Sequence, residues 1–220
     1  MKYGQGGENM NNIEQLLEKS ANIQQFAKRY FSYFFKLLGE LELDAIAAFA
    51  EEMEKARQNR NTIFFIGNGG SAVTASHMAN DFGNDIRKRT NTDTPFRVLS
   101  LTDNTAVMLA IANDDGYDNL FVNQLRIHYQ RGDKLVAISA SGNSPNIVAA
   151  AEWIKAQGGV VMALVGFDGG KLKEFSDVVI HVKSMKGEFG PVEDIHLIMN
   201  HLLSYWLQYR IQKEQNMEKK

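Results

Sequence analysis

Apolar residues recur at every third or fourth position across residues 13–60, which is the period of an amphipathic α-helix. The two series are Phe26, Tyr30, Phe34, Leu37 and Leu38, then Leu43, Ile46, Phe49 and Met53. They predict two helices that meet within residues 39–44. The apolar stripes are wide for helices that only cover a sheet, so they favour either extensive core packing or a helical contact between subunits.

A different pattern begins after Asn61, where residues 62–66 form a short apolar run without polar alternation. Such runs are typical of strands that are buried on both faces. Four further segments are predicted strands, at residues 96–100, 134–138, 160–165 and 177–181. Segments with helical patterns follow them, at residues 72–84, 106–112, 119–129, 145–157 and 192–214. This alternation predicts an α/β fold with a doubly wound, parallel five-stranded sheet, right-handed crossovers and helices on both faces.

The length of 220 residues suits one α/β domain, and 44% hydrophobic with 23% charged residues is ordinary for a folded, soluble protein. We expect a single domain over residues 13–215 that includes the N-terminal helices, a flexible polar leader at residues 1–12 and a tail at residues 216–220. The leader lacks the apolar segment of a signal peptide, and no run approaches the roughly 20 apolar residues that span a bilayer. The expected location is the cytoplasm.

Charge and cysteine content exclude several kinds of partner and site. The 24 basic and 26 acidic residues nearly cancel, which gives no electrostatic basis for binding nucleic acid or an anionic membrane surface. The chain has no cysteine, so disulfides, thiolate nucleophiles and zinc–cysteine sites are excluded. A bound metal would therefore need His, Asp, Glu or Gln ligands.

Two glycine–serine turns each lie between a predicted strand and a predicted helix. The first contains Gly67, Asn68, Gly69, Gly70 and Ser71, and the second contains Ser139, Ala140, Ser141, Gly142, Asn143 and Ser144. Glycine lets backbone N–H groups approach an anion, and a helix N-terminus favours negative charge. Either turn alone also fits a purely structural role. Two of them at the carboxyl edge of one sheet favour a phosphorylated small molecule as ligand.

Four polar residues on the predicted helices have the chemistry of metal ligands or of an acid/base pair. His77 and Asp81 are four residues apart and share one helix face. Glu193 and His201 are eight residues apart, about 80° around a straight helix and about 12 Å along it, which is near the limit for meeting one ion. His196 points about 140° away from His201. The set suits zinc or another divalent metal, whereas His77 and Asp81 alone also fit an ordinary surface pair.

These motifs resemble those of the sugar isomerase (SIS) domain family, in particular its phosphoheptose isomerase branch, over residues 12–209. The residues that carry the resemblance are the two turns, His77, Ala112-Asn113-Asp114, Asp168-Gly169-Gly170, Glu193-Asp194-Ile195-His196 and His201. The resemblance implies the doubly wound SIS fold. It also implies a homotetramer, with an N-terminal helical extension for oligomerisation and with sites built between subunits.

The resemblance further implies a reaction and roles for individual residues. The implied reaction is the aldose–ketose isomerisation of sedoheptulose 7-phosphate to D-glycero-D-manno-heptose 7-phosphate, through an enediol. The implied substrate-binding residues are Asn68, Gly69, Gly70, Ser71, Asn113, Asp114, Ser139, Ala140, Ser141, Ser144 and Glu193, with the phosphate at the serines. The implied zinc ligands are His77, Asp81, Glu193 and His201, of which Asp81 and His201 form the catalytic pair.

The chain departs from the family pattern at three places. Asp81 and Glu193 stand where the family has Glu and Gln, and residues 190–192 are Gly-Pro-Val where the family has an Asp and an Arg. Two alternatives therefore stay open: an isomerase of another sugar phosphate, or a non-catalytic phosphosugar-binding regulatory or scaffold protein of the same family. The retained acid/base pair favours an enzyme, because a regulatory protein would have lost it.

Overall fold

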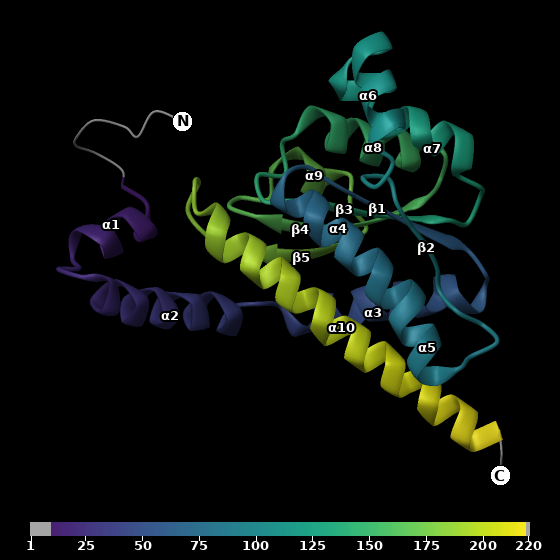
Figure 1. Ribbon diagram of the computed structural model, residues 1–220, viewed down its shortest axis with the longest axis horizontal. Helices are drawn as coiled ribbons and strands as arrows, with labels where there is room; N and C mark the ends of the chain where they lie inside the picture. The colour runs from purple at the N-terminus through teal and green to yellow at the C-terminus, as the bar shows by residue number, and fades with distance from the viewer. Residues whose placement is uncertain (1–9, 219–220) are drawn as a thin grey trace.

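The computed structural model describes residues 10–218, in which five strands form one parallel sheet of order β2-β1-β3-β4-β5 (Figure 1). The strands are β1 (Thr62–Gly67), β2 (Arg97–Ser100), β3 (Lys134–Ser139), β4 (Val160–Gly166) and β5 (Val178–Val182). The predicted doubly wound sheet is thus confirmed. The strand order reverses between β1 and β3, so the carboxyl ends of these neighbours flank the switch point at which α/β sheets bind ligands.

Helices cover both faces of the sheet. They are α1 (Asn12–Glu18), α2 (Ile23–Gly39), α3 (Leu43–Gln58), α4 (Gly70–Asn80), α5 (Ile86–Thr90), α6 (Thr105–Asp114), α7 (Val122–His128), α8 (Pro145–Ala156), α9 (Gly170–Glu174) and α10 (Phe189–Glu218). A π-helical turn spans Asp81–Asp85, and a 3₁₀ turn spans Tyr117–Asn119.

Two hydrophobic cores lie on opposite sides of the sheet. One packs α3, α4 and α10 against the face that carries Phe65 and Leu164. The other packs α7 and α8 against the face that carries Phe64 and Leu135. Neighbouring residues of β1 therefore enter different cores, which is why this strand shows no polar alternation in the sequence.

The N-terminal region forms three helices, not the predicted two. The first break falls at Asn22, because its side chain accepts a hydrogen bond from the Gln25 N–H and caps α2. Helices α1 and α2 extend away from the sheet (Figure 1). They are anchored just before α10 by the buried carboxylate of Glu188, which accepts hydrogen bonds from the Asn12 N–H and the Tyr33 hydroxyl.

The helix that follows β1 is longer than predicted. It continues from α4 through the π-helical turn into α5 and ends at Thr90, beyond the predicted end at residue 84. Asn91 terminates it in the left-handed conformation, with φ of 48°. The basic residues 87–89 lie in the last turn, where positive charge is stabilised by the helix dipole.

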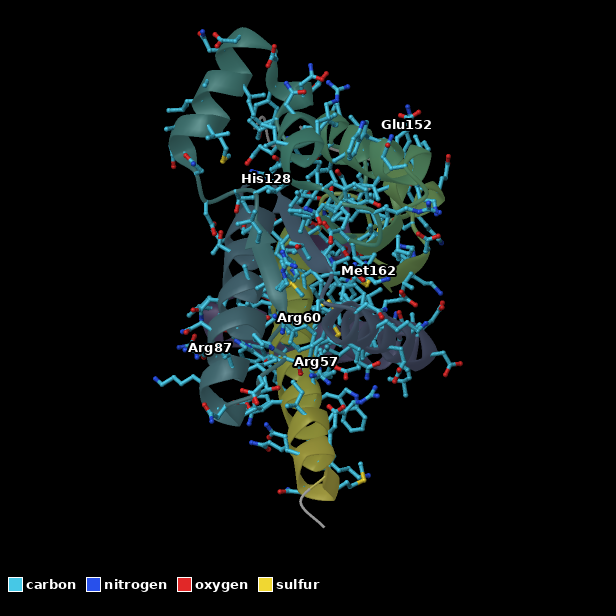
Figure 2. The ribbon with its side chains drawn as sticks, turned by 90° about the vertical axis from the view of Figure 1, so that its right-hand side faces the viewer. Arg57, Arg60, Arg87, His128, Glu152 and Met162 are labelled. Carbon is cyan, nitrogen blue, oxygen red and sulfur yellow. The ribbon has the colours of Figure 1, made fainter. Side chains whose placement is uncertain are left out.

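Helix α10 is also longer than predicted, and the predicted tail at residues 216–220 begins inside it. Its last turns are held to the domain by Glu214, which pairs with the buried Arg57 of α3 over 2.7 Å. Arg57 is labelled in Figure 2. Gln215 Nε2 also donates to the Thr90 carbonyl over 3.1 Å. Residues 1–9 and 219–220, which belong to the predicted leader and tail, lie outside the described residues. Within the described part of the chain, no helix is long and apolar enough to cross a membrane.

Candidate functional site

The two glycine–serine turns lie side by side at the switch point. Asn68 Nδ2 donates to Asn146 Oδ1 over 2.9 Å, and Asn146 Nδ2 donates to Asn68 Oδ1 over 3.0 Å. The Tyr117 hydroxyl also donates to Asn68 Oδ1, over 3.0 Å. Asn146 is completely buried at the beginning of α8. This amide pair, which the sequence analysis did not single out, fixes the first turn to the helix that follows the second.

The second turn gathers neutral hydrogen-bonding groups at the N-terminus of α8. Ser139 Oγ accepts from the Gly142 N–H over 3.1 Å, and Ser141 Oγ accepts from the Asn143 N–H over 3.3 Å. Ser144 is the N-cap residue, and within residues 10–218 its hydroxyl makes no capping hydrogen bond. Backbone amides, serine hydroxyls and a helix N-terminus are the groups that bind phosphate without a cation.

The turn around Gly169 supports the second turn. Gly142 has a positive φ of 61°, and a Cβ atom there would lie 1.9 Å from the Gly169 carbonyl oxygen, so the close approach of the two turns requires glycine. The Leu172 N–H donates to the Gly142 carbonyl over 2.8 Å, and the Lys171 N–H donates to Asn143 Oδ1 over 3.1 Å. The Asp168-Gly169-Gly170 motif thus buttresses the serine turn.

The first turn meets the carboxylate of Glu193. A Cβ atom on Gly70 would lie 2.3 Å from Glu193 Oε2, so this carboxylate lies directly against the first turn of α4. Burial, and then the charge of neighbouring Asp194, raises the pKa of Glu193. No residue of the described chain pairs with its carboxylate through a hydrogen bond or an opposite charge. Ser71 is also buried at this turn.

His77, Asp81 and His201 come together where α4 runs beside α10 (Figure 1). The Asp81 Oδ2 atom lies 3.3 Å from His77 Nε2 and 3.8 Å from His201 Nε2. The two imidazole rings are 5.1 Å apart, at an interplanar angle of 75°. Of the four predicted metal ligands the structure therefore groups three. Glu193 stands apart, because two further turns of α10 separate it from His201.

Asp81 is held by two side-chain amides. Asn200 Nδ2 donates to Asp81 Oδ2 over 2.8 Å, and Asn80 Nδ2 donates to Asp81 Oδ1 over 3.1 Å. Asn200 is completely buried, and its Oδ1 atom has no hydrogen-bond partner among the described residues. Asp81 also opens the π-helical turn, a distortion that is frequent at functional sites. Sequence reasoning missed Asn200, although it directly precedes His201.

A pocket of about 210 Å³ opens beside the His77, Asp81 and His201 cluster. Its other lining residues are Asp85, Ile86, Arg89, Ser204, Tyr205 and Gln208. Arg89 lies 3.9 Å from Asp85, and both side chains are more than a third exposed. The basic run that contains Arg89 therefore borders the site.

Three other polar residues lie away from this cluster. Asn113 and Asp114 are at the exposed end of α6, where Asn113 Nδ2 donates to Asp114 Oδ1 over 2.7 Å. His196 is buried in the domain, and burial lowers its pKa to about 4. The expected divergence of His196 from His201 is confirmed, because His201 borders the pocket.

The donor set of the cluster fits a divalent metal. One ligand atom each from His77, Asp81 and His201 can be chosen so that all lie within 4.8 Å of one another. Two imidazole nitrogens and a carboxylate oxygen, with one side open to a pocket, are the ligands of a catalytic zinc site. Asn200 and Asn80 supply the outer hydrogen bonds that orient such a carboxylate.

The fold and the paired turns are those of a known class: a model of the SIS domain family matches residues 29–166, and the chain belongs to that family. Within it, the chain is similar to phosphoheptose isomerases. It is 36% identical to that of Rhodospirillum rubrum over 160 residues, which is 72% of this chain and 82% of the relative. It is 37% identical to that of Aneurinibacillus thermoaerophilus over 168 residues, which is 76% of this chain and 82% of the relative.

A solved structure gives the same result. The phosphoheptose isomerase of Neisseria gonorrhoeae superposes with a TM-score of 0.77 at 28% identity, covering 86% of this chain and all of that one. The fold and family inferred from the sequence are therefore confirmed.

Proposed function

We propose that the chain is an aldose–ketose isomerase that interconverts sedoheptulose 7-phosphate and D-glycero-D-manno-heptose 7-phosphate. The observation that carries the proposal is the meeting of His77, Asp81 and His201 beside a pocket, on helices that pass the paired turns. The similarity to phosphoheptose isomerases supports this substrate.

In this proposal the serine turn binds the phosphate through Ser139, Ala140, Ser141 and Ser144. The sugar then passes the first turn, where Asn68, Gly69, Gly70, Ser71 and Glu193 contact it. Asn113 and Asp114 are further proposed substrate contacts. Binding energy gained at the phosphate orients the carbonyl end toward the polar cluster.

Isomerisation moves a proton between two neighbouring carbons. It requires a base for the carbon-bound proton and an acid for the carbonyl oxygen. Asp81 accepts the proton from one carbon while His201 protonates the carbonyl oxygen, which gives the enediol. Asp81 then returns the proton to the neighbouring carbon as His201 removes the proton of the other hydroxyl, and the reverse reaction uses the same two groups. His77, Asp81 and His201 would hold a zinc ion, which would supply stabilisation of negative charge on the substrate oxygen. The amide of Asn200 keeps Asp81 oriented throughout.

A homotetramer is the assembly that we propose, in the cytoplasm. Helices α3 and α10 form an apolar groove of about 670 Å³, lined by Leu43, Ile46, Ala47, Ala50, Glu51, Leu202, Leu203, Tyr205, Trp206 and Tyr209. Leu43 is 77% exposed and Tyr205 is 65% exposed, which is unusual for an isolated folded domain. Tyr205 also lines the pocket, so a subunit seated in the groove would border the active site.

A second candidate is an isomerase of another sugar phosphate. Asp81 is one methylene shorter than the family's Glu, and Glu193 carries a charge that the family's Gln lacks, so the site differs where the sugar would lie. The regulatory alternative is disfavoured, because the acid/base pair is present and its members face each other.

The test is NMR spectroscopy of the purified protein with sedoheptulose 7-phosphate, with and without added zinc. We expect signals of the aldoheptose phosphate and incorporation of deuterium from D₂O at the carbon that is protonated. A panel of C5 to C7 sugar phosphates separates the two candidates. A protein that binds these esters but isomerises none of them would support the regulatory alternative instead.

A further inference from the structure

Two buried polar side chains of α10 have atoms without a hydrogen-bond partner in the described chain. These atoms are both ring nitrogens of His196 and the Oδ1 atom of Asn200. His196 is 1% exposed, and Asn200 is completely buried. Within the described part of α10, no other residue has such a buried and unpartnered side-chain atom. Because buried polar groups in folded proteins are nearly always hydrogen-bonded, these two residues need an explanation.

His196 and Asn200 are neighbours on one face of α10, and their chemistry is complementary. They are four residues apart, a spacing that brings the Cβ atoms to within about 5–6 Å of each other. Burial lowers the pKa of His196 to about 4, so at neutral pH the ring is uncharged and carries one N–H donor. Asn200 Oδ1 is an acceptor. The same helix face therefore offers one buried donor and one buried acceptor.

One internal water molecule would satisfy both groups. The two side chains are neighbours, but they make no direct hydrogen bond to each other. A buried water typically makes about three hydrogen bonds to polar groups that otherwise have none. Here it would accept from the His196 ring and donate to Asn200 Oδ1. The Val165 carbonyl of β4, whose effect on the pKa of His196 opposes that of burial, is a further acceptor beside the ring.

The other end of the Asn200 amide contacts Asp81. Asn200 Nδ2 donates to Asp81 Oδ2 over 2.8 Å. Because the amide is planar, a contact that fixes its oxygen also fixes the direction of its N–H groups. A hydrogen bond to the oxygen also polarises the amide and strengthens the bond that the nitrogen donates. His196 does not line the pocket beside Asp81, so its influence on the reaction would pass through Asn200.

We propose that His196 is a positioning residue: joined to Asn200 through an internal water molecule, it fixes the amide that orients Asp81. This inference rests on the proposed function, in which Asp81 moves the proton between two carbons. The orientation of Asp81 then depends on a residue that touches neither the pocket nor the cluster of His77, Asp81 and His201.

The experiment is a double-mutant cycle on the isomerisation of sedoheptulose 7-phosphate with added zinc. His196→Met removes the ring and keeps an apolar side chain, and it should lower kcat about tenfold with little change in KM. In the Asn200→Leu background the same change should alter kcat by less than about twofold, because no amide is left to orient. Equal factors in the two backgrounds would overturn the inference. An unchanged kcat in His196→Met would also overturn it.

Two further variants separate positioning from packing. His196→Gln retains a donor and an acceptor, so it should keep most of the turnover that His196→Met loses. Ile195→Val is the matched control, because Ile195 is also completely buried and the change removes only one carbon. It should leave kcat unchanged. A loss of kcat in Ile195→Val as large as that in His196→Met would assign the effect to packing and overturn the inference.

The side-chain amide of Asn200 gives a second readout, which does not depend on turnover. Its ¹H–¹⁵N NMR signals are identified by their absence in Asn200→Leu. They should shift in His196→Met and stay in place in Ile195→Val, and signals unmoved by His196→Met would overturn the inference. An intact protein that isomerises no sugar phosphate would overturn the proposed function, whereas the NMR result would still decide whether His196 and Asn200 are joined.

Discussion

Asn68 and Asn146 exchange two hydrogen bonds through their side-chain amides, and this exchange joins the turn after β1 to the helix after β3. A ligand that contacts both turns therefore meets them at a fixed separation. The pair is 78 residues apart in the sequence, and Asn146 is completely buried. The two turns consequently act as one preorganised surface.

Asn146→Ala should lower the free energy of unfolding by ~2 kcal/mol, because it removes both hydrogen bonds and leaves the Asn68 amide without its partner. Urea denaturation measures the change. Binding of sedoheptulose 7-phosphate should weaken as well. Asn123→Ala is the control, because Asn123 makes its amide hydrogen bond at the surface. Equal unfolding free energies for the two variants would contradict the role of the pair.

Ser141→Ala or Ser144→Ala should weaken binding of the sugar phosphate by about 1.5–3 kcal/mol, which is the usual value of a hydrogen bond to a charged group. Folding should be unaffected, because neither hydroxyl holds the domain together. Calorimetric titration gives the dissociation constants. Unchanged constants in both variants would remove the serine turn from the binding site.

His201→Ala and Asp81→Asn should each reduce turnover by about 10²–10⁴-fold, the usual contribution of a positioned acid or base. Both should still bind the phosphate end, which lies at the serine turn. Both should also lower the affinity for zinc, measured by competition with a chelator, since each removes a ligand. His128→Ala, at the exposed end of α7, is the control (Figure 2). Turnover that survives both changes would show that the pair is not catalytic.

Asn200→Leu tests whether orientation of Asp81 matters to catalysis. The variant removes the 2.8 Å hydrogen bond to Asp81 Oδ2 and, with it, a buried Oδ1 atom that has no partner in the described chain. These effects on folding oppose each other, so the free energy of unfolding should change by less than about 1 kcal/mol. Turnover should nevertheless fall about tenfold or more, with little change in KM. A large loss of stability with normal turnover would make Asn200 purely structural.

His196 should make the fold sensitive to acid. Its pKa is about 4 in the folded chain, against an ordinary value of 6.5, because burial disfavours the charged ring. The unfolded chain therefore binds a proton first as the pH falls. The stabilisation is present above the unfolded pKa and is lost as the pH falls from there toward the folded pKa, by ~2 kcal/mol between pH 7 and pH 5.

Urea denaturation of the intact protein and of His196→Met at these two pH values isolates this part of the pH dependence. The variant should lose less stability on acidification than the intact protein. Equal losses would show that another group is responsible.

The sequence predicted the sheet well and the helix boundaries less well, for a physical reason. Strands β1 and β4 are almost uninterrupted apolar runs, which few other structures produce. The break at Asn22 was missed because a capping asparagine looks like any other polar position in a helical pattern. The π-helical turn at Asp81–Asp85 leaves no mark in the spacing of apolar residues.

The candidate site, too, was predicted only in part. His77 and Asp81 were predicted together, because four residues on one helix share a face. Glu193 was assigned with them by resemblance, although its separation from His201 on a straight helix already placed it near the limit of reach. Asn200 is neither a metal ligand nor an acid or base, so its residue type gave no signal. A buried amide that orients one of them is recognised only from its contact.

The anchor of the N-terminal helices has a consequence for how the protein is made. Glu188 accepts hydrogen bonds from the Asn12 N–H and the Tyr33 hydroxyl. These two residues precede it by 176 and 155 positions, so they leave the ribosome long before it does. At the usual rates of synthesis, roughly 5–20 residues per second, α1 and α2 wait on the order of ten seconds or more without their attachment point. For that time the Tyr33 hydroxyl therefore lacks the carboxylate that accepts its hydrogen bond in the finished fold.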